Sequence, residues 1–343
     1  MAAKRTCIVT PDLAGPTRNG GIGTHCLYLA RLMARRGMAV TVVHTAHAES
    51  GEAETWKRLY RETHGVDLVM LDELPEADGV SILPLTARHT IAHRVDRWLR
   101  AQVPAFDEVH FQDWQGNGAI AVRAKRCGAA HAATRLVVTV HGPSEWIREG
   151  MQEFPAAGRE GLIEDALERS AIADADLLIC PSRAIRSWLS TQGWPVPADT
   201  RVLPILFEVP GTPVVPRAVA PGGLEELIFF GRLETRKGLE VFLAALEILA
   251  TRSDPVETQA KPVRVHFVGK PHITRLGPAE AAIEQARSVC GGRFSFEIHP
   301  SLDHAGALAF LREHSHALAV MPSLADNLPY TVIECLALGQ PLL

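Results

Sequence analysis

The sequence lacks two features that would each indicate a particular class of protein. It has no excess of positive charge, because 35 Lys and Arg residues against 39 Asp and Glu residues give a formal net charge of -4, whereas proteins that bind a nucleic-acid backbone usually carry a basic surface. It also has no C-x-x-C spacing, since its six cysteines stand at positions 7, 26, 127, 180, 290 and 335. We therefore expect no nucleic-acid partner, and we expect buried thiols in a reducing compartment rather than a disulfide framework.

Long apolar runs are absent as well. No window reaches the roughly 18 consecutive apolar residues of a membrane-spanning helix. The first five residues lead directly into a short strand, with no apolar segment of signal-peptide length before it. We expect a cytoplasmic protein. A peripheral contact with a membrane through Lys57, Arg58 and Arg61 stays open, although a surface helix is the favoured interpretation of residues 55–74.

What is present is the composition of a globular protein with a large core. The 343 residues, 47% hydrophobic and 22% charged, exceed one ordinary doubly wound unit and suit two. Short apolar strands alternate with helical segments, which predicts parallel, doubly wound sheets. The predicted strands are 5–10, 38–44, 108–111, 136–140, 177–180, 226–230, 264–268, 294–298 and 317–321, and the predicted helices of the second half are 238–250, 279–290, 305–314 and 329–338.

A run rich in proline divides the chain. Prolines at 210, 213, 216 and 221 interrupt any regular element between residues 209 and 223. We place an N-terminal Rossmann-like domain at residues 1–208, a linker at 209–223 and a second Rossmann-like domain at 224–343, and we expect a cleft between the domains. The last three residues look like the start of one more buried strand, so we expect the second domain to be truncated.

Two segments of the second half carry groups suited to a sugar diphosphate. Ligands of open α/β sheets bind beyond the carboxyl ends of the strands. Arg232 and Lys237 lie between a predicted strand and helix, where cations and backbone N–H groups can together hold a diphosphate. Asp326 follows a later strand and can accept from sugar hydroxyls, and Glu334 on the next helix can accept from a ribose diol. For each segment taken alone, a solvated basic loop or a capped surface helix remains the alternative.

Helix starts offer backbone N–H groups to the same ligand. Pro329 suits a first helical position and Asn327 an adjacent cap, so we expect the N–H groups of that turn to point into the cleft. In the first half, Gly20, Gly21 and Gly23 precede a helix and let the backbone approach a bulky or anionic ligand. Their spacing is not G-x-G-x-x-G, so an NAD site is disfavoured.

Two patterns suggest a metal ion, but each has a more ordinary explanation. Asp174 and Asp176 form a D-x-D sequence at a junction between helix and strand, where we expect no metal role. His89 and His93 have i, i+4 spacing but no H-E-x-x-H motif, so a solvated helix face is favoured. We expect neither a metal nor another cofactor.

Taken together, the segments resemble the glycogen-synthase-like retaining glycosyltransferases of glycosyltransferase family 4. The resembling segments follow the family's order and are 20–25 with 29–32, 111–114, 139–142, 180–182, 231–238 and 322–334. The resemblance implies an α/β fold of two facing Rossmann-like domains, known as GT-B. It also implies a metal-independent retaining hexosyltransferase of glycan, cell-wall or polysaccharide biosynthesis. Such an enzyme transfers a sugar from a nucleotide-diphosphate donor to a glycan, lipid-linked or small-molecule acceptor by front-face displacement, in which the leaving phosphate takes the acceptor proton.

The resemblance also assigns roles to individual residues. Arg232 and Lys237 would neutralise the leaving diphosphate, and Asp326 would hold hydroxyls of the transferred sugar. Glu334 would bind the ribose, and His141 would hydrogen-bond the donor sugar near the reacting carbon. The remaining contacts with donor or phosphate fall to Gly21, Gly23 and the backbone N–H groups of Asn327 and Leu328, and contacts with the acceptor fall to Asp113 and Trp114.

The sequence departs from the family pattern at three places, and two other functions stay open. Asp326 stands where the family has the first Glu of its E-x₇-E motif, Gln112 stands where His is frequent, and residues 203–206 replace a Pro-Asn-Gly sequence. These departures concern the identity of sugar and acceptor. The alternatives are a nucleotide-sugar 2-epimerase of the same architecture and a non-enzymatic two-domain binding protein.

Overall fold

The computed structural model describes residues 3–17, 20–47, 52–74, 86–208, 224–252 and 261–343. The chain divides into two compact units, of which the first contains Met1–Trp146 and Pro155–Glu208 and the second contains Ile147–Phe154 and Val209–Leu343. The predicted linker at 209–223 lies outside the described residues, as does Asn19 before the first helix.

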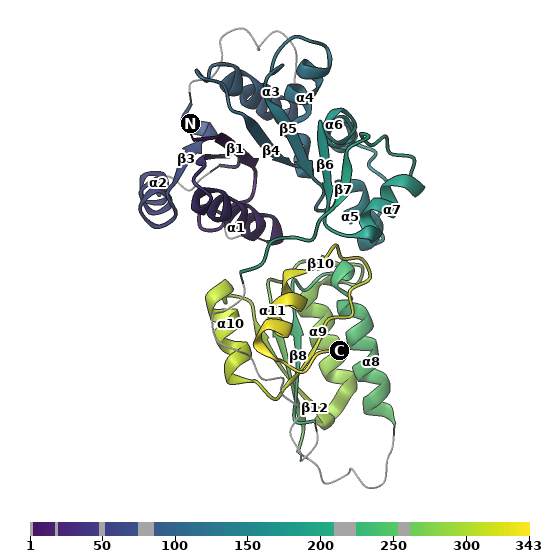
Figure 1. The fold of residues 1–343 in the computed structure, drawn as a ribbon. Helices are drawn as coiled ribbons and strands as arrows, with labels where there is room; N and C mark the ends of the chain where they lie inside the picture. The colour runs from purple at the N-terminus through teal and green to yellow at the C-terminus, as the bar shows by residue number, and fades with distance from the viewer. Residues whose placement is uncertain (1–2, 18–19, 48–51, 75–85, 209–223, 253–260) are drawn as a thin grey trace. The chain divides into compact units, whose positions relative to one another are not determined.

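The first unit is built on a seven-stranded sheet in which every strand pair is parallel, with the order β3-β2-β1-β4-β5-β6-β7. The strands alternate with helices along the chain (Figure 1). Buried Val, Ile and Leu side chains fill both faces of the sheet. The strands are β1 (Arg5–Thr10), β2 (Ala39–His44), β3 (Val66–Met70), β4 (Glu108–Gln112), β5 (Arg135–Thr139), β6 (Leu177–Cys180) and β7 (Thr200–Val202).

Helices cover the two faces of this sheet. Successive strand residues point to opposite faces, so Ile8 packs with α1 and α2, whereas its neighbours Cys7 and Val9 pack with α3, α4, α6 and α7. The helices are α1 (Gly21–Arg35), α2 (Ala53–Leu59), α3 (Ala87–Arg100), α4 (Ala119–Arg126), α5 (Ser144–Met151), α6 (Arg159–Asp174) and α7 (Arg183–Thr191).

The second unit has a four-stranded parallel sheet of order β12-β9-β8-β13. Figure 1 shows α8 and α9 on one face of it and α10 and α11 on the other. Leu342 pairs in parallel with Ala319, next to β13. The elements are β8 (Glu226–Phe230), α8 (Leu239–Thr251), β9 (Val263–Val268), the hairpin β10 (Ile273–Thr274) and β11 (Gly277–Pro278), α9 (Ala279–Cys290), β12 (Phe294–His299), α10 (His304–Glu313), β13 (Leu318–Val320) and α11 (Tyr330–Leu338).

The two parallel sheets confirm the predicted α/β class with two Rossmann-like units, and most predicted elements agree within two residues. The prediction for residues 55–74 was wrong in its second half, where β3 follows α2 and a turn. Val66, Leu68 and Met70 are buried while Asp67 is exposed, so a short alternating edge strand lies in a segment whose charges suggested a surface helix. Cys127 is also exposed, at the C-terminal end of α4, whereas the other five cysteines are buried as expected.

Ile147–Phe154 belongs to the second unit, although the division from sequence included these residues in 1–208. Gly150 explains the association, because a Cβ there would lie 2.7 Å from Ala325 Cβ and 2.9 Å from Arg236 Cγ. Only a glycine lets the C-terminal part of α5 approach these two side chains so closely. Sequence patterns locate helices but carry little information about which unit a short helix packs against.

Candidate functional site

The loops after β8 and β13 lie against each other at the carboxyl edge of the second sheet. Gly238 has φ +79°, and a Cβ there would lie 1.9 Å from the carbonyl oxygen of Pro322. The N–H of Leu324 donates to the carbonyl of Arg236 at 2.9 Å. The fold therefore brings together the two segments, 231–238 and 321–329, that the sequence singled out separately.

Lys237 and Asp326 form an ion pair between these loops. Nζ of Lys237 donates to Oδ2 of Asp326, and each side chain is about 15% exposed or less. Burial lowers the pKa of Lys237, while the Asp326 carboxylate opposes that effect. Ser323 Oγ also donates to Oδ2 of Asp326, at 3.3 Å. The pair places a positive and a negative group side by side in a partly desolvated loop region.

Arg232 is more exposed than Lys237 and pairs with Glu234 at 3.2 Å. The same Glu234 oxygen accepts from Nη2 of the buried Arg236 at 3.0 Å. Arg236 also donates from Nη1 to the carbonyl of Ala325 at 3.1 Å, and that nitrogen lies 3.7 Å from Oδ1 of Asp326. The sequence prediction missed Glu234 and Arg236. Their positions within the basic loop were visible, but which of its three cations is buried as a structural bridge depends on the other loop.

The start of α11 differs from the prediction. The helix begins at Tyr330, Pro329 occupies the N-cap position, and its side chain makes no capping hydrogen bond, so Asn327 is not the cap. Asn327 instead donates its N–H to Oδ1 of Asp326 at 3.1 Å, and Leu328 has φ +56°. The turn before the helix is therefore arranged around the Asp326 carboxylate, and Leu328 and Pro329 separate Asn327 from the helix.

Glu334 is buried on α11, with a side chain 5% exposed. Its Oε1 lies 2.8 Å from Nε2 of His304, which begins α10. This hydrogen bond raises the pKa of His304. The hydrogen bond with His304 uses only one of the two oxygens of Glu334. His304 was not predicted, because nothing in the local sequence links residue 304 to residue 334.

In the first unit, Asp113 organises the loops at the carboxyl ends of β4 and β5. Its side chain is fully buried and accepts from the N–H groups of His141 at 2.8 Å and Gly142 at 3.0 Å. Burial raises the pKa of Asp113 to about 6, against these stabilising hydrogen bonds. Trp114, the next residue, is partly buried in a short turn. Asp113 therefore positions the His141 loop and is not accessible to a ligand.

The His141 ring contacts the side-chain amide of Gln112 and the ring of His25. Its Nε2 donates to Oε1 of Gln112 at 2.7 Å, and its ring centroid is 4.9 Å from that of His25. Desolvation and the neighbouring His25 hold the pKa of His141 well below its usual value, so the ring is neutral at pH 7. Gln112 thus fixes which nitrogen carries the proton, a role that explains a Gln at this position.

Gly21 and Gly23 lie in the first turn of α1, next to the carboxylate of Asp12, which was not predicted. Oδ2 of Asp12 accepts from the N–H of Gly20 at 3.2 Å and of Gly23 at 3.1 Å. Negative charge is favoured at a helix N-terminus, so Asp12 stabilises the start of α1. An incoming anion would compete with this carboxylate for the Gly23 N–H. An acidic residue two positions after a strand was the available sequence signal.

A second buried carboxylate, Glu168 on α6, joins the same loops. It accepts from the N–H of Gln115 at 2.9 Å, and from the N–H of Ser144 at 2.7 Å and its hydroxyl at 2.8 Å. Burial raises the pKa of Glu168 well above its usual value. Glu168 was not predicted, since on a helix in mid-sequence it resembles any other solvated glutamate.

The remaining sequence candidates have ordinary partners. Asp174 pairs with Arg123 at 3.0 Å and Asp176 with Lys125 at 2.6 Å, so the two carboxylates of the D-x-D sequence are engaged separately. Lys57 pairs with Glu54 and Glu73. No helix in the described ranges combines the length and apolar character that crossing a bilayer requires.

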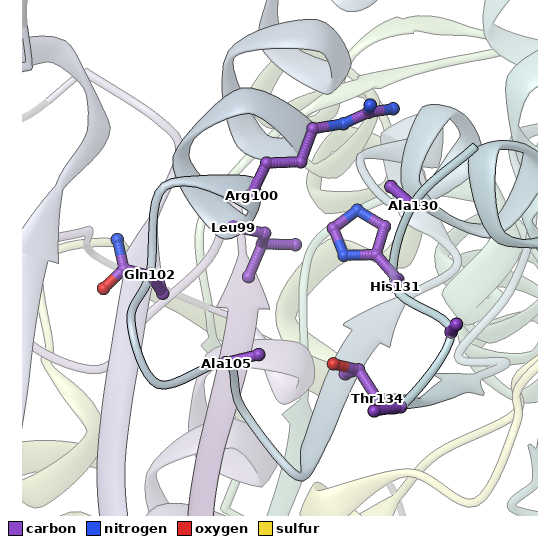
Figure 2. A pocket seen from close by; sticks show the side chains of 9 residues that line it. Leu99, Arg100, Gln102, Ala105, Ala130, His131 and Thr134 are labelled. Atoms are coloured by element: carbon purple, nitrogen blue, oxygen red, sulfur yellow. The ribbon is translucent and has the colours of Figure 1, made fainter.

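Figure 2 shows a hollow elsewhere on the first unit, near the C-terminal end of α3 and the loop before β5. Its lining includes Leu99, Arg100 and His131, with several alanines. Because β5 begins after this loop, the hollow lies at the amino edge of the sheet, away from the loops around Asp113 and His141. None of the predicted site residues lines it.

Comparisons with known proteins agree with this fold. A sucrose-phosphate synthase from Thermosynechococcus elongatus is 18% identical, with 99% of this chain and 80% of that chain covered and a TM-score of 0.63. A variant of TarM from S. aureus, in complex with fondaparinux, alpha-GlcNAc-glycerol and UDP, is 8% identical, with 99% and 85% covered and a TM-score of 0.63. An E. coli structure named for trehalose-6-phosphate and bound with UDP-2-fluoro glucose is 15% identical, with 98% and 82% covered and a TM-score of 0.59.

These likenesses show the two-domain GT-B fold. No curated protein sequence matches the chain. The model of glycosyltransferase family 4 matches residues 19–205, more than half of the sequence. The chain belongs to glycosyltransferase family 4.

Proposed function

We propose that the protein is a retaining hexosyltransferase that uses a nucleotide-diphosphate sugar as its donor. The observation that carries the proposal is the ion pair between Lys237 and Asp326. It places a cation that can bind a phosphate next to a carboxylate that can accept hydrogen bonds from sugar hydroxyls. A donor needs both, a cation for its diphosphate and an acceptor oxygen for its sugar hydroxyls. Structures with the same fold contain UDP or a UDP-sugar analogue, which supports a donor of this class.

Arg232 and Lys237 have the role of stabilising the leaving diphosphate. As the glycosidic bond breaks, negative charge accumulates on the phosphate oxygens, and fixed cations lower the energy of that state. Lys237 suits this role because it is held by Asp326 and is partly desolvated, which strengthens its interaction with an anion. Arg232 is about half exposed and can turn from Glu234 toward a phosphate.

Asp326 and Glu334 are assigned to the donor's sugar and ribose hydroxyls. Both carboxylates lie on the segment that begins beside Lys237 and continues into α11. Each keeps one oxygen oriented by a neighbour, through the N–H of Asn327 for Asp326 and through His304 for Glu334. A preoriented acceptor loses less conformational entropy when it binds a hydroxyl. The N–H of Leu328 completes this assignment, together with the N–H of Asn327 where the donor displaces its hydrogen bond to Asp326.

In the first unit, His141 is assigned to the donor sugar and Trp114 to the acceptor, as the family resemblance implies. The neutral His141 ring can exchange its hydrogen bond with Gln112 for one with a hydroxyl. Asp113, buried under the loop, is assigned the support of His141 instead of a contact with the acceptor. Gly21 and Gly23 are assigned to donor or acceptor contacts in competition with Asp12.

The proposed reaction needs no protein nucleophile and no metal ion. The acceptor hydroxyl attacks the anomeric carbon on the face that the diphosphate leaves, and its proton passes to a leaving phosphate oxygen. The acceptor is a glycan, a lipid-linked sugar or a small molecule, and the protein acts in the cytoplasm.

The test is to incubate the protein with UDP-, GDP- and ADP-sugars, each with and without a panel of acceptors, and to follow release of the nucleoside diphosphate. Product configuration is read by proton NMR, and a parallel reaction contains EDTA. We expect acceptor-dependent release with one donor, a product of unchanged anomeric configuration and no effect of EDTA. Formation of a 2-epimer without acceptor would support the epimerase instead, and a folded protein inert toward every donor would contradict the proposal.

A further inference from the structure

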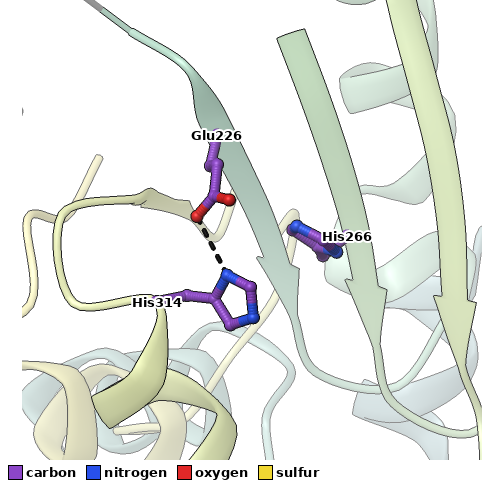
Figure 3. A group of neighbouring side chains, drawn as sticks. All are labelled: Glu226, His266 and His314. Carbon is purple, nitrogen blue, oxygen red and sulfur yellow. Dashed lines mark hydrogen bonds and ion pairs between the residues drawn. The ribbon is translucent and has the colours of Figure 1, made fainter.

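A cluster of histidine and glutamate side chains lies on the second unit, apart from the residues assigned to the donor. Glu226, His266 and His314 each offer one ligand atom, and these atoms lie within 4.8 Å of one another. Glu226 begins β8, His266 lies on β9, and His314 follows the last residue of α10. Figure 3 shows the hydrogen bond from His314 to Glu226 and one nitrogen of the His266 ring turned toward this pair.

Strand register brings the cluster together. In the parallel ladders, His266 is paired with Ile228 on one side and with Glu297 on the other. Side chains two residues apart on a strand share a face, so Glu226, His266, Glu297 and His299 all point toward the face that α10 covers. His314 reaches the same face from the end of α10. The ring of Phe310 stacks on the His314 ring, with 4.1 Å between the ring centroids. Three strands and a helix thus converge on one point.

His266 has a nitrogen suited to a ligand. It is buried, and its Nδ1 lies 3.2 Å from Nε2 of His299 and 3.5 Å from Oε2 of Glu297, on the side of β12. Among the described residues, its Nε2 has no hydrogen-bond partner. Since β9 lies between β12 and β8, Nε2 is the nitrogen left for the side of Glu226 and His314.

This arrangement is the one that metal-binding histidines use. A ligating imidazole usually donates its other N–H to a nearby acceptor, which fixes the tautomer and directs the lone pair. Here Nδ1–H would donate to His299 or Glu297 and leave the Nε2 lone pair bare. Glu226 is oriented in a similar way, because its Oε1 pairs with Arg264 and its Oε2 accepts from His314 at 2.9 Å.

We propose that Glu226, His266 and His314 bind one divalent transition-metal ion of the zinc class. Two imidazoles and a carboxylate suit zinc or cobalt, whereas magnesium and calcium prefer oxygen ligands. With bonds of about 2.0 to 2.1 Å, ligand atoms on a tetrahedral ion lie about 3.3 Å apart. Small side-chain rotations bring the three atoms to this spacing, and His314 binds the ion through Nδ1 in the tautomer that carries its proton on Nε2.

The role of the ion is structural. Glu226 and the last residue of β8, Phe230, are four residues apart, a distance of about 13 Å along a strand, and the donor loop follows Phe230. The ion therefore lies at the other end of β8 from Arg232 and Lys237. It would tie the end of α10 and the start of β13 to β8 and β9, and β13 leads into the loop of Asp326.

The test uses tag-free protein dialysed against a chelator and then titrated with Co²⁺ and with Zn²⁺ by calorimetry. Visible absorption of the Co²⁺ complex reports its geometry, and Mg²⁺ and Ca²⁺ provide the contrasting arm. We expect one equivalent of Zn²⁺ or Co²⁺ to bind, with a rise in Tm, and little binding of the other two ions. The variants are His314→Ala and Glu226→Gln, because His266→Ala alters a buried position and risks misfolding.

A matched control is His93→Ala, which removes one histidine of the i, i+4 pair on α3 and leaves the cluster intact. Each ligand variant is expected to weaken Zn²⁺ binding by at least about 10-fold, while His93→Ala binds like the wild type. Far-UV circular dichroism checks that each variant is folded. An absence of Zn²⁺ and Co²⁺ binding by the wild type, or equal binding by folded His314→Ala and Glu226→Gln, would overturn the proposal.

Discussion

The ammonium group of Lys237 donates a hydrogen bond to the carboxylate of Asp326, 89 residues further along the chain. The contact exists because two loops at the carboxyl edge of the second sheet pack tightly, with Gly238 against Pro322. In the sequence, each loop taken alone was only weak evidence for a donor site. Their contact gives the candidate donor site a defined geometry, and the proposed function depends on it.

Lys237→Ala is expected to reduce turnover by about 10²- to 10³-fold, because it removes a preoriented cation from the leaving phosphate. The measurement is the initial rate of nucleoside diphosphate release, with Tm recorded for each variant. Lys57→Ala is the control, since Lys57 also pairs with carboxylates but lies on α2 of the first unit. Turnover by folded Lys237→Ala at the rate of the control would remove Lys237 from the site.

The sequence predicted the sheets well because buried strands of this fold are short apolar runs that differ clearly from their surroundings. Arg5–Thr10 and Glu226–Phe230 agree residue for residue with the prediction. β3 was missed because Asp67 and the charges before it resemble a solvated helix, while its pairing with β2 depends on the fold. Edge strands are stabilised by a neighbour, and their own sequence records this less clearly.

For the site, the sequence indicated the residues that stand at strand ends but not their supports. Glu168 and His304 bind groups 53 and 30 residues away in the sequence, so their roles appear only when the chain is folded. Asp113 was predicted to contact the acceptor, but its side chain is completely buried and accepts hydrogen bonds from the N–H groups of His141 and Gly142. Residue type and spacing identify polar side chains near a site, whereas burial decides which of them can reach a ligand.

Gly238→Ala is expected to destabilise the second unit by more than about 3 kcal/mol, because it combines a left-handed backbone with a backbone clash. The clash is with Pro322, whose carbonyl oxygen leaves 1.9 Å for a Cβ. Gly65→Ala is the control, since Gly65 has a similar left-handed conformation and nothing within 4 Å. That variant should cost about 1 to 2 kcal/mol. Equal losses in chemical denaturation would mean that the two loops do not pack as described.

We expect the buried His25 to make the free energy of unfolding depend on pH. Burial lowers its pKa to about 4, with a smaller contribution from His110, while an unfolded histidine titrates near about 6.5. Between these values the unfolded chain binds more protons, so the contribution is complete above about pH 6.5 and is lost as the pH falls toward 4. Since one pKa unit corresponds to about 1.4 kcal/mol, the loss is about 3 kcal/mol.

The check is the free energy of unfolding of wild type and His25→Gln, measured by urea denaturation at several pH values between 4 and 7. The variant lacks the titrating ring, so the difference between the two proteins should change across this window. A constant difference would show that His25 has an ordinary pKa in the folded protein.

Donor binding tests the central claim most directly, since it asks whether the nucleotide contacts the residues at the carboxyl edge of the second sheet. Calorimetric titration of the preferred nucleotide sugar should give at least about 10-fold weaker binding to Glu334→Ala than to the wild type, because a ribose hydrogen bond to a charged group contributes about 1.5 to 3 kcal/mol. The buried Glu334 pairs with His304, so His304→Ala controls for loss of that pair. Equal affinity of wild type and folded Glu334→Ala would contradict the account.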